Sequence, residues 1–262
     1  MEFTIPSFFI PTGSQHCNIC GINTNFWFIR GHNNDATVKY NIIGGGRRKV
    51  NCPNCCSSDR DRLIKLFFED LPPSGNILHV APEKALLRIL KNKPNIHLTQ
   101  IDKKVGWYKY IYGRDVKDGD LTELQFENEQ FDWVIANHVL EHIENENFAI
   151  EEIYRVLKPD GKAIIQIPFS RKIKSTIEAK PNWSKSVKVK KLGQKDHVRL
   201  YGLDFPNRWN KFKVNILEPK DSNIVKKLNL NDQEPVILLS KSNFLQKIQN
   251  FNRKSFEKIV KT

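Results

Sequence analysis

Four of the five cysteines form two CxxC pairs in the first part of the chain. Cys17 and Cys20 stand in CNIC, and Cys52 and Cys55 stand in CPNC. Each pair presents two thiolates to one ion, and two pairs complete the tetrahedral sulfur site typical of structural zinc. The alternatives are two disulfides, which a reducing cytoplasm disfavours, and a redox CxxC, which needs only one pair. The spacing therefore predicts that these four residues bind zinc.

The residues beside the pairs fit this interpretation. Cys56 and His16 are expected to lie outside the ligand set, although Cys56 is the one competitor for the position of Cys55. Four thiolates around one Zn²⁺ leave a net charge of about −2, which the Arg-Arg-Lys run at 47–49 is placed to offset. A module of this size has a small core, so the metal is expected to supply much of its folding energy.

A second group of polar residues follows short apolar runs further along the chain. The run 77–80 passes directly into a helical pattern in NILHVAPEKALL. Ala81, Pro82 and Glu83 stand where nucleotide-binding turns usually carry glycine. Asp102 ends the next run about 20 residues beyond that turn, where a carboxylate accepts hydrogen bonds from a ribose diol. The pattern predicts a nucleoside-binding edge with an unusual first loop.

The elements that position these residues alternate between short apolar runs and helical patterns, which indicates parallel strands in βαβ units. The expected strands are 77–80, 97–101, 111–116, 133–136, 163–167, 213–217 and 236–239, with helices at 83–90 and 147–157. We therefore predict an α/β fold with a Rossmann-like, seven-stranded, mostly parallel sheet and helices on both faces. Such a sheet binds ligands at the carboxyl ends of its strands.

Residues 119–169 carry a more specific pattern. FDWVIANHVLEH followed by EEIYRVLKPDG resembles the class I S-adenosylmethionine-dependent methyltransferases with FD.I...HVLEH and E..RVLKPGG. The resemblance covers about 77–170. GQKDHVRLYGLDF at 193–205 is similar to a segment of bacterial methyltransferases that also carry an N-terminal CxxC…CPxC module and are associated with surface-polysaccharide pathways. The resemblance implies S-adenosylmethionine as cofactor beside zinc.

The first loop suits that cofactor, because S-adenosylmethionine has no phosphate that requires crowded backbone amides. A small side chain at Ala81 and a fixed φ at Pro82 can still form a wall beside the ribose and methionine portion. The carboxylate of Glu83 is expected to face the ligand's ammonium group. The cofactor residues of this loop are His79, Val80, Ala81, Pro82 and Glu83.

The other cofactor residues follow later strands. By the resemblance, Asp102 binds the ribose, and Asp120 and Leu121 lie against the adenine, the carboxylate accepting from the exocyclic amine. Asn137 and His138 follow the fourth strand and are expected beside the methionine portion and the methyl group. The alternative for Asp120 is a turn residue in KDGD. His142 stands one helical turn after His138, and we interpret it as structural because no third metal ligand is evident.

Methyl transfer to a hydroxyl is helped by a general base. His197 is our first candidate for that base and His138 the second, with Asp196 orienting His197. Arg199 and Tyr201 would share a face with His197 in an extended segment and bind an acidic or phosphorylated acceptor. The alternative is that DHVRLYG only packs an insertion onto the sheet.

The formal net charge of +13 is concentrated at one end. Residues 171–262 hold 22 Lys/Arg and 8 Asp/Glu. This third is therefore expected to have a cationic surface that binds RNA, an anionic membrane or a phosphorylated substrate, or that is only solvated. Three functions follow. The first is an O-methyltransferase acting on a glycan or related small metabolite, the second an RNA-modifying methyltransferase, and the third a non-catalytic, zinc-stabilised binding protein.

The composition predicts three parts. Residues 1–60 form the zinc-binding module, with short strands at 21–31 and 37–46 and a helix capped by Ser57 or Ser58. Residues 61–242 form the methyltransferase domain with a basic insertion near 171–195, and 243–262 form a basic amphipathic helix that docks on the domain, a partner or anionic lipid. The chain lacks a run of roughly 20 apolar residues and a signal-like start, which predicts a cytoplasmic protein.

Overall fold

The computed structural model describes residues 4–91, 93–103, 115–241 and 255–258. Its main sheet has eight strands in the order β12-β10-β11-β7-β6-β3-β4-β5. Their bounds are β3 (Gly75–Val80), β4 (Ile96–Asp102), β5 (Val116–Asp118), β6 (Phe131–Ala136), β7 (Leu157–Ile164), β10 (Lys213–Pro219), β11 (Val236–Ser240) and β12 (Phe256–Lys258). Strands β3 to β7 pair with one another in parallel, whereas β11 is antiparallel to both β7 and β10. The predicted mostly parallel sheet is confirmed, with one strand more than expected.

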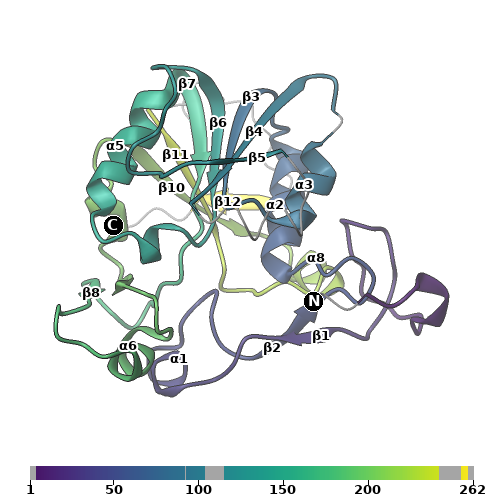
Figure 1. Ribbon diagram of the computed structural model, residues 1–262. Coiled ribbons are helices and arrows are strands. Elements are labelled where there is room, and N and C mark those ends of the chain that lie inside the picture. Colours follow the sequence, from purple (N-terminus) through teal and green to yellow (C-terminus); the bar gives the residue numbers. More distant parts are fainter. Residues whose placement is uncertain (1–3, 92, 104–114, 242–254, 259–262) are drawn as a thin grey trace.

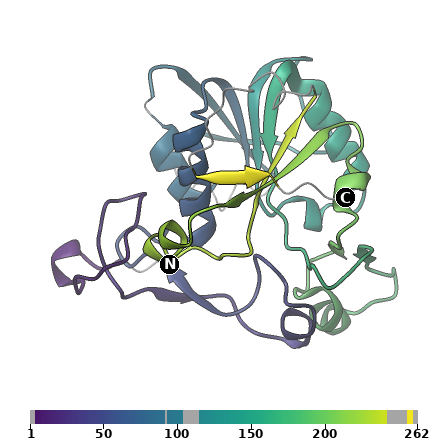
Figure 2. The ribbon, with the colours of Figure 1, turned by 180° about the vertical axis from the view of Figure 1, so that it is seen from behind.

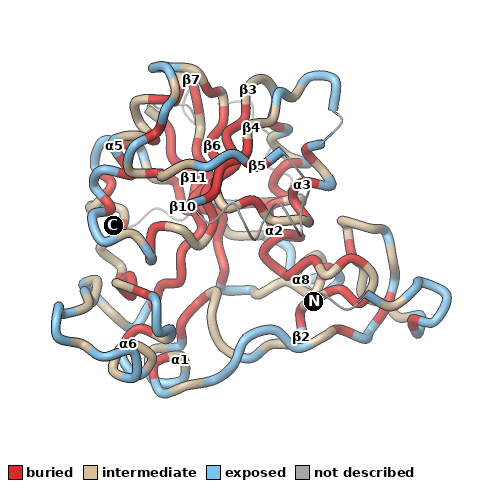
Figure 3. Tube along the Cα trace, viewed as in Figure 1, coloured by how far each residue is buried: buried red, intermediate tan, exposed pale blue. Residues whose placement is uncertain are grey.

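Helices cover both faces of this sheet (Figure 1). Helices α2 (Asp59–Asp70) and α3 (Lys84–Leu90) lie on one face and α5 (Glu146–Val156) on the other. The side chains of β6 alternate between the two cores, with Val134 packing on the α5 side and Ile135 on the α2 side. The central strands are therefore buried on both faces, as Figure 3 shows in red. A parallel sheet with both faces covered requires such continuous apolar runs.

The N-terminal part is built from a 3-10 turn η1 (Ser7–Phe9), a two-stranded sheet of β1 (Phe28–Arg30) and β2 (Arg48–Asn51), and helix α1 (Asp35–Tyr40). The strand predicted at 37–46 is wrong, because α1 occupies its first residues. Asn34 and Thr37 form a capping box that starts this helix, and Asn41 ends it in the left-handed conformation. Capping hydrogen bonds here prevail over the strand preference of the β-branched side chains. Ser58 caps α2 as predicted.

The segment between β7 and β10 contains β8 (Ile177–Glu178), α6 (Lys185–Leu192), β9 (Arg199–Leu200) and the short α7 (Phe205–Arg208). Helix α6 packs against α1 of the N-terminal part, and both views of the ribbon show the two helices side by side (Figures 1 and 2). Ala36 and Ile42 share a small core there with Leu192 and Leu200. Two segments far apart in sequence thus form one lobe next to the sheet.

The helix predicted at 243–262 is wrong for residues 255–258, the part of this range that the structure describes. Phe256–Lys258 forms β12, an edge strand antiparallel to β10, instead of helix (Figure 2). Phe256 packs in the core beneath α2 and Ser255 is held by Asp70, which fixes the strand there. The remainder of the helix predicted at 243–262 lies outside the described residues. Within the ranges given above, no helix is both long and apolar enough to cross a membrane.

Candidate active site

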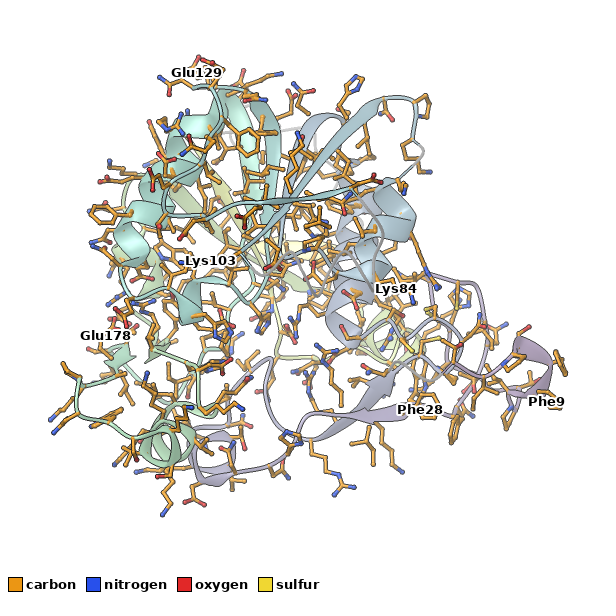
Figure 4. The ribbon with its side chains drawn as sticks, viewed as in Figure 1. Phe9, Phe28, Lys84, Lys103, Glu129 and Glu178 are labelled. Carbon is orange, nitrogen blue, oxygen red and sulfur yellow. The ribbon has the colours of Figure 1, made fainter. Side chains whose placement is uncertain are left out.

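The carboxyl ends of the parallel strands face the N-terminal part and the insertion. Figure 4 shows Glu129, which precedes β6, at the far end of the sheet, and Lys103, which follows β4, at the end nearer to them. Most of the predicted cofactor residues follow the strands at this edge. They are Ala81 after β3, Asp102 at the end of β4, Asp120 and Leu121 after β5, and Asn137 and His138 after β6. The fold brings these residues to one edge.

The first loop has a strained backbone. Ala81 has φ 47°, in the left-handed region that favours glycine, and its amide donates to the carbonyl of Ile101 at 2.9 Å. Alanine pays about 1 kcal/mol for this conformation. Glu83 precedes α3 and its Oε2 lies 2.6 Å from Nε2 of the buried His79. Burial raises the pKa of Glu83, but the hydrogen bond and charge of His79 outweigh it and the pKa lies below its ordinary value.

Two acidic residues frame the nucleoside end of this edge. Asp102 is buried, at 8% exposed. Asp120 accepts hydrogen bonds from the Thr122 amide at 3.0 Å, the Thr122 hydroxyl at 2.8 Å and Lys103 Nζ at 2.6 Å. Partial burial raises the pKa of Asp120, but Lys103 and Thr122 together lower it below its ordinary value. The turn predicted as the alternative for Asp120 is therefore present, and its carboxylate is held in one orientation.

Unpartnered polar atoms mark the same edge. Asn137 is 4% exposed, yet neither its amide oxygen nor its amide nitrogen has a hydrogen-bond partner within the described part of the chain. The same holds there for Nδ1 of His79 and Oε1 of Glu83. A buried polar group without a partner costs about 1–3 kcal/mol. Several such groups at one edge fit a polar ligand that would complete their hydrogen bonds.

A cavity of about 860 Å³ adjoins this edge. Its walls come from the N-terminal part, the segment after β6 with the 3-10 turn η2 (Leu140–His142), Pro168 after β7, and the insertion. Its polar lining residues include Arg30, Arg60, His138, Glu141, His142 and His197. Since His138 belongs both to this cavity and to the cofactor edge, the cavity is placed to receive a second substrate.

His197, our first candidate base, lines the cavity and is 3% exposed. Its Nδ1 donates to the Leu192 carbonyl at 3.1 Å, and its Nε2 has no partner among the described residues. Burial lowers the pKa of His197 to about 4, with the charge of His142 contributing. Asp196 was expected to orient this ring. Its carboxylate instead lies 3.6 Å from His142 Nδ1, so the orienting group of His197 is a backbone carbonyl.

Arg199 and Tyr201 have structural contacts in place of the predicted acceptor contacts. The guanidinium of Arg199 donates to the carbonyls of Leu140, Ile143 and Glu144 at 2.5–2.8 Å and pairs with Glu178. The hydroxyl of Tyr201 donates to Glu146 at 2.6 Å and is fully buried. Neither residue lines the cavity. For these two residues the alternative interpretation, in which DHVRLYG packs the insertion onto the sheet, fits the structure.

His138, the second candidate base, has a backbone conformation and a carboxyl neighbour that the sequence did not predict. Its φ is 54°, and its Nδ1 lies 3.1 Å from Oε1 of Glu141. Burial, with the charges of Arg60 and Arg30, lowers the pKa of His138 well below its ordinary value. Glu141 is 0% exposed, and burial raises its pKa to about 8. Sequence reasoning missed Glu141, although it stands in the quoted HVLEH motif.

Arg60 and Arg48, which line the cavity, flank a buried acid, Glu234. Glu234 is 4% exposed and lies 3.6 Å from Arg60 and 3.8 Å from Arg48, which also pairs with Asp59. Burial and the charge of Asp59 raise the pKa of Glu234 from 4.5 to about 7, against the opposing effect of both arginines. Folding therefore stabilises the neutral form of Glu234 relative to the unfolded chain.

This shift predicts how stability changes with pH. Because the folded pKa of Glu234 is above the unfolded one, its contribution to stability is present below pH 4.5 and is lost as pH rises through about 7. Between about pH 5 and pH 9, we expect the wild type to lose on the order of 2 kcal/mol more free energy of unfolding than Glu234→Gln. Urea unfolding at both pH values measures the difference. The exposed Glu69→Gln is the control, and equal pH slopes for wild type and Glu234→Gln would refute the prediction.

The cysteines form a compact sulfur cluster. Sγ of Cys17 lies 3.6 Å from that of Cys55, and Sγ of Cys20 lies 3.7 Å from that of Cys52. All four sulfurs lie within 4.8 Å of one another and none is in a disulfide. A tetrahedral ion with bonds of about 2.3 Å requires edges of about 3.8 Å, so the cluster fits zinc. Cys56 and His16 lie outside it.

The cation beside this cluster is Arg62, which the sequence did not single out. Its guanidinium lies 4.3 Å from the ring centre of Trp27 and donates to the carbonyls of Ser57, Val50 and Leu228. The predicted Arg48 pairs with Asp59 instead. Leu228 follows helix α8 (Ser222–Lys227) of the central domain, so this one buried residue joins the cysteine module to that domain.

Comparison with known proteins agrees with this architecture. Residues 83–165 match the family described as "Methyltransferase domain". The match lies in the part of the chain that forms the central sheet and its polar carboxyl edge, so this part is similar to a methyltransferase domain. The curated demethylmenaquinone methyltransferase of Lactobacillus johnsonii is 30% identical over 108 residues, which are 41% of this chain and 39% of that protein. The chain therefore spans well under half the length of this relative.

Two solved structures with a partly similar chain trace carry methyltransferase descriptions. A phosphoethanolamine N-methyltransferase 2 from Haemonchus contortus, in complex with S-adenosyl-L-methionine, has 15% identity and a TM-score of 0.47, covering 74% of this chain and 54% of that one. A possible histamine N-methyltransferase from Thermotoga maritima has 16% identity and a TM-score of 0.45, covering 70% and 88%.

Proposed function

We propose that the protein transfers a methyl group from S-adenosylmethionine to a hydroxyl of a small, anionic, glycan-type acceptor. The cavity of about 860 Å³ that shares His138 with the cofactor edge is the observation that carries this proposal. Its volume lies within the about 300–1,000 Å³ of small-molecule sites. Arg30, Arg60 and Lys195 line it, and they favour a phosphate or carboxylate on the acceptor. The resemblance of GQKDHVRLYGLDF to a segment of bacterial methyltransferases associated with surface-polysaccharide pathways supports a sugar.

The cofactor would be held by the first loop, Asp102, Asp120, Leu121 and Asn137. Bound there, S-adenosylmethionine would supply an electrophilic methyl carbon, and its sulfur would keep the electron pair of the broken C–S bond when the acceptor oxygen bonds to that carbon. His138 is our choice for the base, because it stands where the cofactor edge meets the cavity and its Nε2 is unpartnered among the described residues. It accepts the hydroxyl proton, and Glu141, whose Oε1 lies 3.1 Å from Nδ1, orients the ring.

The sulfur cluster has a structural role in this proposal. Cys17, Cys20, Cys52 and Cys55 would hold one zinc ion with all four positions filled by protein. The module that they fix contributes Arg30, Gly44 and Arg48 to the cavity wall. Zinc would thus affect the acceptor site indirectly, by keeping the module that forms part of its wall folded.

Calorimetric titration tests the cofactor site. Wild-type protein is expected to bind S-adenosylmethionine and S-adenosylhomocysteine, and Asp102→Asn to bind both about 10- to 100-fold more weakly, because a charge-assisted hydrogen bond to the ribose is lost. Asp118→Asn is the matched control, since Asp118 is an exposed acid on the neighbouring β5. The absence of any binding by the wild type would contradict the enzymatic proposal and favour a binding protein.

A transfer assay tests the acceptor class. Methyl-labelled S-adenosylmethionine is incubated with a panel of sugar phosphates, nucleotide sugars and uronic acids, and separately with total RNA. We expect label in an anionic sugar. Label in RNA alone, with binding that weakens steeply as salt increases, would replace this acceptor with the nucleic-acid alternative.

A further inference from the structure

A second cluster of metal-binding side chains lies in the cavity, away from the cysteines. Glu141, His142 and His197 each offer one ligand atom, and these atoms all lie within 4.8 Å of one another. Glu141 and His142 come from η2 after β6, whereas His197 comes from the insertion immediately before β9. The ring centres of the two histidines are 5.0 Å apart. The fold, and not sequence spacing, brings these groups together.

His197 is oriented as a ligand. Its Nδ1 donates to the Leu192 carbonyl at 3.1 Å, so the neutral ring carries its lone pair on Nε2. That nitrogen is buried and has no partner within the described residues. Histidines that bind metals usually donate the other ring nitrogen to a carbonyl or carboxylate in this way. His142 has the same arrangement, because its Nδ1 lies 3.3 Å from the carbonyl of Asp196.

Glu141 supplies the carboxyl ligand. Its side chain is 1% exposed, its Oε2 has no hydrogen-bond partner in the described part of the chain, and its Oε1 lies 3.1 Å from Nδ1 of His138. A buried carboxylate left in this state is costly, and a metal ion or a donor must compensate for it. Ligand atoms around one ion with bonds of about 2.1 Å lie roughly 3–4 Å apart, so a movement of about 1 Å closes the cluster.

We propose that Glu141, His142 and His197 bind a divalent first-row transition-metal ion in the acceptor cavity. Two imidazoles and one carboxylate suit ions such as Zn²⁺ and Mn²⁺ and leave coordination positions open. The open positions face the cavity, because all three residues line it. This site is distinct from the cysteine cluster, in which every position is occupied by a thiolate.

The role of the ion, unlike its binding, rests on the proposed function. An acceptor hydroxyl bound to the ion releases its proton more readily. His138 lies next to the ligand Glu141 and receives that proton. The acceptor oxygen then bonds to the methyl carbon as above, and the ion undergoes no redox change. This arrangement assigns His197 to metal binding and leaves His138 as the base.

Metal counting on the full-length protein tests the site. After saturation with Zn²⁺ and removal of unbound ions, we expect two zinc ions per chain in the wild type and one in His142→Ala. The His142 side chain is 36% exposed, so this variant is expected to fold. Measuring its thermal unfolding checks this expectation. His32→Ala is the matched control, because His32 lines the same cavity outside the cluster and should retain both ions.

Cobalt identifies the ligands. When Co²⁺ is titrated into protein that already holds one zinc ion, visible d–d bands without a thiolate charge-transfer band are expected in the wild type and are lost in both His142→Ala and Glu141→Gln. One zinc ion in the wild type, or two in wild type and His142→Ala alike, would overturn the proposal. Binding of S-adenosylmethionine is measured separately, so failure of the methyltransferase proposal would leave this result intact.

Discussion

Cys17→Ser is expected to lose its zinc ion and several kcal/mol of unfolding free energy, because binding at a structural zinc site is coupled to folding. Cys17 is 0% exposed, and its sulfur contacts those of the other pair. The small core around Trp27 has few other apolar contacts to stabilise it. Zinc analysis together with urea unfolding measures both losses. Since the same module walls the cavity, binding of the acceptor should weaken as well.

Cys56→Ser is the control for this substitution. Cys56 is adjacent to Cys55 in sequence but lies outside the sulfur cluster. The control should retain zinc and wild-type stability. Zinc retained in Cys17→Ser, or an equal loss in Cys56→Ser, would contradict the assignment of the four ligands.

His138→Gln is expected to reduce the rate of methyl transfer by about 10²- to 10⁴-fold, the usual contribution of a general base. Glutamine keeps a polar side chain of similar reach but cannot take up the proton. The rate is measured with whichever sugar of the acceptor panel is methylated fastest. Binding of S-adenosylmethionine should change by only a few fold, because the ribose and adenine contacts remain.

His32→Gln serves as the control for His138, since both histidines line the cavity and only His138 follows β6. A weaker affinity for S-adenosylmethionine with an unchanged maximal rate would show that His138 positions the cofactor and is not the base. An equal loss of rate in both variants would point to a general effect of the cavity.

Much of the fold follows from local patterns. The helical spacing of Ile150, Ile153 and Leu157 predicts α5, which ends one residue earlier at Val156. The runs 77–80 and 133–136 predict β3 and β6, since buried parallel strands must be continuously apolar. The errors arise where neighbouring segments decide the outcome. One is α1, where a capping box starts a helix in a β-branched stretch, and the other is β12, whose pairing with β10 joins distant residues.

The site was predictable only at the sheet edge. Ala81, Asp102 and Asn137 follow strands, and the end of a strand fixes where a residue lies. Arg199 and Glu141 could not be assigned in that way. Arg199 is held by the carbonyls of Leu140 in η2 and of Ile143 and Glu144 just after it, and Glu141 meets His197 through the folding of the insertion. Such long-range contacts leave no periodic signal in the sequence.

The lobe in which α1 packs against α6 has a practical consequence for redesign. Residues from the α1 and α6 regions form the cavity wall, while Asp102 and Asp120 belong to the sheet edge. Exchanging a side chain such as Val189 should therefore change which molecule is modified, while donor affinity and the scaffold stay unaltered. The architecture separates selectivity from chemistry, which makes this lobe the natural target for directed evolution.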